Sequence, residues 1–208
     1  IDIDVTGTIA VRGPSSAAIG LLSQLVFEEA TKSLFEIDIT EGAVVTSRDG
    51  PAMANATNGG PGIDTIITIA GSVATSVPNG LAIDFQIGED LLTLLPTADI
   101  TGGIDLGASD DGLVLAGSSG TTGTLDLDVS PLIGIESYTK TGQGGWILAG
   151  DGTGLVGTFD VQAGLLAVNG DLSGMAFDVA AGATLGGTGT VGGLPPIAGG
   201  IAPGSNGA

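Results

Sequence analysis

The sequence predicts an all-β chain in which short strands coil on themselves, one turn of the chain stacking on the last. Residues 138–193 contain short apolar runs separated by Gly or Asn-Gly, and none of these runs is long enough for a typical helix. Glycine accounts for 39 of the 208 residues. Apolar residues make up 42% of the chain but aromatic residues only 3%, which predicts a core of stacked Leu, Ile and Val.

Strict alternation of apolar and acidic residues marks the individual strands, beginning with residues 1–5. The same pattern recurs at residues 35–39, 81–87, 125–129, 159–161 and 177–179. A period of two places the apolar side chains on one face of a strand and the carboxylates on the other. We therefore expect most of these aspartates to lie on a solvated outer face.

Residues 19–36 are the one ambiguous stretch. The apolar residues from Ile19 to Ala30 fall loosely at helical spacing, and Leu, Gln, Glu, Ala and Lys are good helix formers. Gly20 interrupts that pattern, no clean N-terminal capping box is present, and strands are expected on both sides. We expect two more short strands here, with a short helical excursion from the coil as the alternative.

Residues 48–62 are predicted to be a loop because Gly, Pro and Asn dominate them. This loop is the only candidate domain boundary, and we see no interdomain linker, so residues 1–208 are interpreted as one β-helical region. Asn55-Ala56-Thr57 fits an N-glycosylation sequon, to which we assign no role.

The spacing of successive coils is clearest in residues 88–127. Apolar runs at residues 91–95, 104–106, 113–115 and 125–127 are separated by Gly, Asp and Ser. With about 20–24 residues per coil, we expect the chain to make roughly nine coils.

Charge and composition exclude several classes of function. The chain has 4 basic and 23 acidic residues, a net charge of −19, which disfavours nucleic acids and anionic membranes as partners. It contains no Cys and no His. Disulfides, zinc–thiolate sites, Ser-His-Asp triads and Cys-His pairs are therefore excluded.

Paired carboxylates remain the one catalytic option, as in enzymes that cleave polysaccharides. Such sites normally gather several carboxylates with basic side chains on one face. The four basic residues are instead scattered along the sequence, at Arg12, Lys32, Arg48 and Lys140. We therefore predict no catalytic residues and no enzymatic activity in this chain.

Calcium is the cation that the sequence brings into question. Residues 59–67 match the nonapeptide of calcium-binding β-rolls, G-G-x-G-x-D-x-U-x, with Asp64 as its acid. One copy does not form such a site, because the ion is held between tandem turns, and only partial echoes occur near Asp90 and Asp111. Glu89-Asp90 and Asp110-Asp111 are expected to be solvated corners, with weak cation binding left open. We predict no metal site and no cofactor.

The wording of the C-terminal half resembles a known family. Residues 138–170, from YTKTGQGGWILAG to AGLLAVNG, resemble the passenger-associated repeat of bacterial autotransporters, and Lys140 belongs to that wording. Residues 180–204 are similar to the segment that follows this repeat, and the resemblance extends over residues 80–208. It implies a right-handed, single-stranded parallel β-helix (a β-solenoid), secreted to the cell surface through a C-terminal outer-membrane barrel. That barrel, a partner from the same precursor, is expected to lie outside this sequence.

These observations lead to a structural interpretation of function. We expect a β-helical stalk of an autotransporter passenger, which displays a surface or adhesin region and supports passenger folding after export. The alternatives are an adhesin that binds through the helix face, favoured by an exposed apolar or aromatic patch, and the polysaccharide-degrading enzyme. Leu194, Ile197 and Ile201 are apolar where a polar cap would be expected. We therefore expect a passenger that continues beyond this sequence, an exposed last coil and end-to-end self-association.

Overall fold

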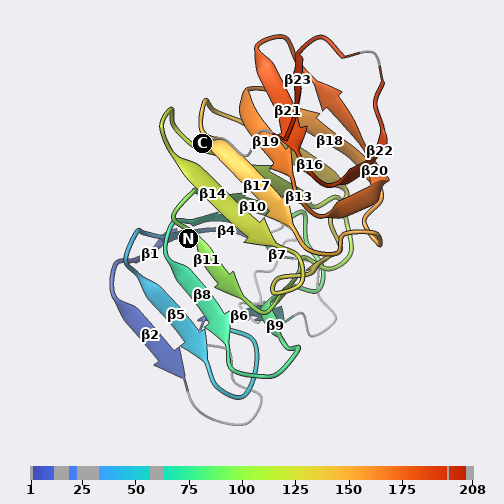
Figure 1. The fold of residues 1–208 in the computed structure, drawn as a ribbon. Coiled ribbons are helices and arrows are strands. Elements are labelled where there is room, and N and C mark those ends of the chain that lie inside the picture. The colour runs from blue at the N-terminus through green and yellow to red at the C-terminus, as the bar shows by residue number, and fades with distance from the viewer. Residues whose placement is uncertain (1, 12–18, 23–32, 57–62, 196, 205–208) are drawn as a thin grey trace. The chain divides into compact units, whose positions relative to one another are not determined.

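The computed structural model of the chain describes residues 2–11, 19–22, 33–56, 63–195 and 197–204. Over these residues every regular element is a β-strand, and the strands pair in parallel. The all-β prediction is confirmed. The chain divides into two compact units (Figure 1). Unit 1 comprises Ile1–Thr93, Thr97–Gly112 and Leu132–Ile135, and unit 2 comprises Leu94–Pro96, Leu113–Pro131 and Glu136–Ala208.

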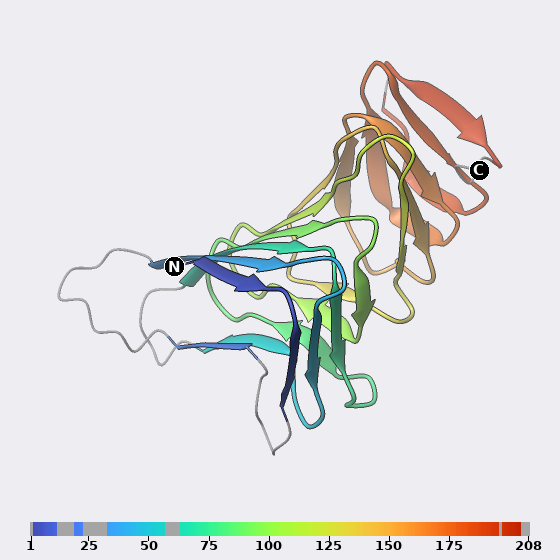
Figure 2. The same ribbon diagram turned by 90° about the vertical axis from the view of Figure 1, so that its left-hand side faces the viewer.

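Unit 1 contains strands of three parallel sheets, which Figure 2 shows from the side as blue-to-green layers. The first sheet holds β1 (Asp2–Val5), β4 (Ser33–Ile39), β7 (Ile63–Ile69) and β10 (Leu91–Leu94). The second holds β2 (Thr8–Val11), β5 (Val44–Ser47), β8 (Ser72–Thr75) and β11 (Asp99–Thr101). The third holds β3 (Ile19–Leu22), β6 (Met53–Ala56), β9 (Leu81–Asp84), β12 (Gly103–Asp105) and β15 (Leu132–Ile133). Successive strands enter successive sheets, and we call one such passage a coil.

Unit 2 places only two strands in each coil. Its first-sheet strands are β13 (Gly112–Leu115), β16 (Ser137–Lys140), β18 (Gly157–Val161), β20 (Asp171–Val179) and β22 (Thr190–Gly193). A fourth sheet holds β14 (Thr122–Asp126), β17 (Gly145–Ala149), β19 (Gly164–Val168), β21 (Ala183–Gly187) and β23 (Gly200–Pro203).

Coil length differs between the units, and this corrects the predicted period of about 20–24 residues. In unit 1 Val45 pairs with Val73 and Val73 with Ile100, which are steps of 28 and 27 residues. In unit 2 Leu148 pairs with Val168, a step of 20 residues. The reason is geometric, because a coil with a third strand also needs a further corner. The predicted period therefore applies only to the two-strand coils.

The alternation of apolar and acidic residues gives the expected inside and outside. On β4, Ile37 is 1% exposed, while its neighbour Asp38 lies on the exposed face. On β20, Phe177 is fully buried and Asp178 is exposed. The core is mainly aliphatic, as predicted. It is supplemented in unit 2 by a stack of three rings on adjacent strands, with centroids 5.7 Å apart for Tyr138–Phe159 and 5.9 Å apart for Phe159–Phe177.

Glycine is abundant because backbones of successive coils meet closely at the corners. A Cβ on Gly170 would lie 2.2 Å from the carbonyl oxygen of Gly150, and one on Gly189 would lie 2.0 Å from that of Gly170. No other residue fits at these positions without moving the backbone. The three glycines form a column in which each coil leaves room for the next.

Two local predictions meet the structure differently. The ends of the ambiguous stretch are strands, β3 and β4, as expected, while residues 23–32 lie outside the described residues. The predicted loop at residues 48–62 is wrong in part, because β6 lies within it and Met53 is fully buried. Met53 pairs with both Ile19 and Ile83 in the third sheet, so register with neighbouring coils overrides a loop-like composition. No described helix is long and apolar enough to span a membrane.

Candidate functional site

The three aspartates that the sequence brought into question for calcium lie on successive coils of unit 1. Oδ1 of Asp90 accepts a hydrogen bond from the Thr65 backbone N–H at 2.7 Å. Oδ1 of Asp111 accepts one from the Asp90 backbone N–H, also at 2.7 Å. Asp64 is engaged in the same way, since its Oδ1 accepts the backbone N–H of Glu89 at 2.9 Å. Each carboxylate thus holds the backbone of another coil.

Asp90 and Asp111 are buried, with 3% and 1% of their surface exposed. The expectation of solvated corners is therefore wrong for these two residues. Thr65, Asp90 and Asp111 all point into the interior, and we call these three residues the polar column. Burial raises the pKa of Asp90 from its ordinary 3.8 to about 7, and the charges of Asp111 and Asp64 raise it further, while the contact with Thr65 opposes the rise.

The chemistry of the polar column differs from that of a calcium site. Calcium takes six to eight oxygen ligands, several of them from carboxylates. Here Oδ1 of each of the three aspartates is occupied by a backbone N–H. Among the described residues, no group of three or more acidic side chains could hold a metal ion. The arrangement instead links coils through hydrogen bonds to carboxylates, which are stronger than those between neutral groups.

Lys140 is the functional group that sequence reasoning missed. It is fully buried in unit 2, and its Nζ donates to the carbonyl oxygens of Thr141, Gly142 and Ala163 at 2.8, 2.9 and 3.0 Å. The ammonium group has three donors, and all three are used. Burial lowers its pKa from 10.5 to about 8. A signal was available, because Lys140 is two residues after the inward-facing Tyr138 and shares its face of β16.

Asp84 and Asp105 form the nearest approach to a catalytic carboxylate pair. They are register partners on β9 and β12 of the third sheet. Burial raises the pKa of Asp84, and the charge of Asp105 adds to this effect. Oδ1 of Asp105 accepts the backbone N–H of Gly107 at 2.9 Å, which fixes the local turn. The pair therefore has a structural use for one of its two carboxylates.

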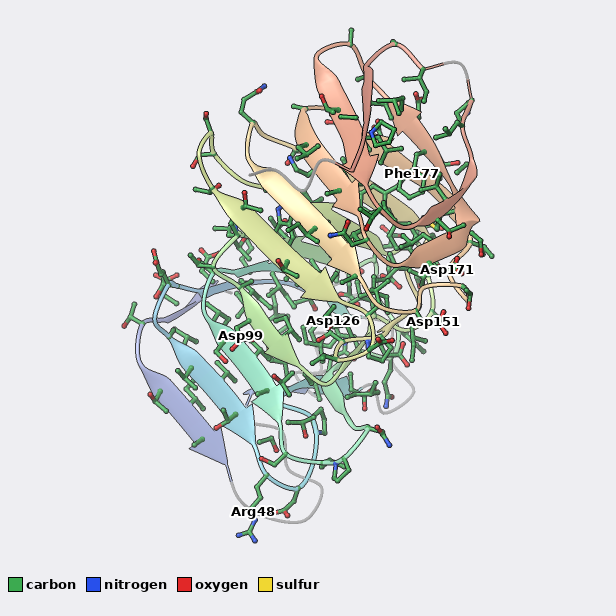
Figure 3. The ribbon with its side chains drawn as sticks, viewed as in Figure 1. Arg48, Asp99, Asp126, Asp151, Asp171 and Phe177 are labelled. Carbon is green, nitrogen blue, oxygen red and sulfur yellow. The ribbon has the colours of Figure 1, made fainter. Side chains whose placement is uncertain are left out.

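The exposed carboxylates at one corner of unit 2 also act locally (Figure 3). Oδ1 of Asp126 accepts the N–H of Asp128, and Oδ1 of Asp128 accepts that of Asp151, both at 3.0 Å. Oδ1 of Asp171 accepts the N–H of Ser173 at 3.0 Å. These are turns in which an aspartate bonds the backbone two residues on, together with one link between coils.

The sequon asparagine is part of the fold. Asn55 is 2% exposed, and its Oδ1 accepts the backbone N–H of Gln86 at 2.8 Å. Its side chain thus joins β6 to the segment that follows β9, which gives the residue a structural role.

Comparison of the chain with protein-family models, with curated proteins and with solved structures found no match.

Proposed function

We propose that the chain is the structural stalk of an autotransporter passenger, built as a right-handed, single-stranded parallel β-helix. The stalk displays a surface or adhesin region and supports folding of the passenger after export. The observation that carries this proposal is the register of the coils. On β4 and β7, seven successive residue pairs match, from Ser33–Ile63 to Ile39–Ile69. On β18 and β20, five pairs match, from Gly157–Met175 to Val161–Val179.

The polar interior supports the same proposal. Asp90, Asp111 and Lys140 are the kinds of side chain from which binding and catalytic sites are built. Each of them bonds backbone groups of other coils or corners. Their use in coil-to-coil bonds is what a scaffold requires.

The resemblance places this stalk in a biological setting. Its best-matching residues, 138–170, cover β16 to β19 of unit 2. The proposed partner is the C-terminal outer-membrane barrel of the same precursor, and the proposed location is the bacterial cell surface. We prefer a stalk to an adhesive face, because every described aromatic side chain is buried, the most exposed being Phe35 at 9%.

The test is surface display. The chain is placed between a signal peptide and an autotransporter barrel in a Gram-negative host, and a matched variant carries Val161→Asp, which puts a charge at a fully buried position on β18. The control is Asp160→Asn on the outer face of the same strand. We expect the native chain and the control to reach the surface and resist added protease, and the Val161→Asp chain to be degraded.

Two results would contradict the proposal. One is retention of the native chain inside the cell under conditions in which a known passenger is exported by the same barrel. The other is equal protease resistance of the native and Val161→Asp chains at the surface, because a stalk must owe its resistance to the packed core.

A further inference from the structure

The polar column interrupts an otherwise apolar interior in unit 1. Thr65 lies on β7, Asp90 immediately precedes β10, and Asp111 immediately precedes β13. Their exposed fractions are 0%, 3% and 1%. Because Asp90 shares the parity of the buried Leu92 and Leu94, it occupies a core position at the start of the strand.

The column holds more acceptors than donors. Oδ1 of Asp90 is satisfied by the Thr65 N–H at 2.7 Å. Oδ2 of Asp90 and Oγ1 of Thr65 are buried and have no hydrogen-bond partner. An ionised carboxylate with a buried, unbonded oxygen is strongly disfavoured. A proton on Oδ2 removes the charge and supplies the donor that the column lacks.

The charged groups around Asp90 reinforce this preference. Asp64 on β7, Glu89 beside Asp90, and Asp110 and Asp111 before β13 are all acidic. Among the described residues of unit 1, Arg48 is the only basic one, and it follows β5 in the second sheet (Figure 3). The described surroundings of Asp90 therefore offer a proton more readily than a balancing cation.

We propose that Asp90 is a proton-operated latch, whose protonated carboxyl group holds neighbouring coils of unit 1 together and whose ionisation loosens them. The inference does not depend on the proposed function. Its sign follows from linkage. The folded carboxyl binds its proton more tightly than the unfolded one, so unit 1 loses stability as pH rises from about 4 to about 7 and changes little beyond. Unit 1 is thus firmer in a mildly acidic medium than in an alkaline one.

The test is hydrogen exchange of the Thr65 and Asp90 amides, measured by NMR from pH 4.5 to 8.5 and corrected for the intrinsic exchange rate. We expect protection to fall by up to roughly tenfold per pH unit between pH 5 and 7, and then to level off. A local readout is needed because Asp84, in the third sheet, also has a raised pKa. Emission from Trp146, the single tryptophan and part of unit 2, reports whether the other unit stays folded.

Two variants assign the effect. Asp90→Asn keeps an Oδ1 acceptor for the Thr65 N–H but does not ionise, so protection should become independent of pH. Asp38→Asn, on the exposed face of β4, should keep the pH dependence of the native chain. Protection that does not change with pH in the native chain, or that still changes in Asp90→Asn, would overturn the proposal.

A second measurement serves if Asp90→Asn does not fold. The carboxyl carbon of Asp90 in the native chain is titrated by NMR. A midpoint near 7 supports the latch, and a midpoint near the ordinary value of about 4 overturns it.

Discussion

The backbone N–H of Asp90 donates a 2.7 Å hydrogen bond to Oδ1 of Asp111, a residue 21 positions further along the chain. That distance in sequence is one coil, so the side chain at the start of one coil secures the start of the coil before it. Buried carboxylates are usually explained by a ligand or by catalysis. Here the backbone itself is the partner.

Calcium should be dispensable for folding. Oδ1 of Asp64, Asp90 and Asp111 already accepts backbone N–H groups. We therefore expect the same thermal unfolding midpoint in chelator and in millimolar calcium, measured by circular dichroism. Magnesium at the same concentration controls for ionic strength. A rise of many degrees with calcium alone would show that these oxygens serve an ion.

Replacing Lys140 by Met should destabilise unit 2 by about 2–3 kcal/mol, because the carbonyls of Thr141, Gly142 and Ala163 lose a charged donor. Urea unfolding followed by Trp146 emission measures the change. Thr139→Ala, at the neighbouring outward position, is the control and should cost much less. Equal stability of Lys140→Met and the native chain would mean that the buried ammonium contributes nothing to the fold.

Removing the middle ring of the aromatic stack should also be costly. Phe159 is 2% exposed and lies between Tyr138 and Phe177. We expect Phe159→Ala to lower the free energy of unfolding by about 3–5 kcal/mol, through lost burial and the cavity left behind. The same urea titration tests this, with the exposed neighbour Thr158→Ala as control. A loss below about 1 kcal/mol would indicate that the stack is not packed as described.

Self-association should depend on the last described coil. Leu194 and Ile201 are 50% and 47% exposed, whereas Leu185, the register partner of Ile201, is only 4% exposed. We expect light scattering to show association that grows with concentration and is weakened by Leu194→Asp with Ile201→Asp. Val156→Asp is the matched control, because Val156 is 72% exposed elsewhere in unit 2. Loss of association in the control alone would place the contact elsewhere.

Local patterns in the sequence predicted the strands and their faces. Ile37 and Asp38 show why, since a period of two is set by the backbone of a single strand and needs no knowledge of its neighbours. Glycine corners such as Gly170 were predicted for the same reason. The strand at Met53 was missed because its apolar contacts come from neighbouring coils rather than from the flanking sequence.

The polar interior required information that a single strand does not contain. Asp90 and Lys140 share the parity of buried neighbours, so their inward direction was readable in principle. Their partners were not, because Thr65 and Ala163 are 25 and 23 residues away and become neighbours only through coil length. Coil length in turn depends on whether a coil has two strands or three, which no local pattern specified.

Cross-linking tests the central claim, the parallel stacking of coils, most directly. The chain has no cysteine, so pairs can be introduced at outward positions of β18 and β20 and treated with the short thiol cross-linker dibromobimane. In the parallel register Thr158 faces Ala176 and Asp160 faces Asp178. Facing positions lie about 5 Å apart and diagonal ones about 7–8 Å.

We expect the facing pairs, Thr158→Cys with Ala176→Cys and Asp160→Cys with Asp178→Cys, to cross-link efficiently. The exchanged pairs, Thr158→Cys with Asp178→Cys and Asp160→Cys with Ala176→Cys, should react poorly. Preferential cross-linking of the exchanged pairs would mean antiparallel strands and would contradict the stacked-coil account, as would equal cross-linking of all four.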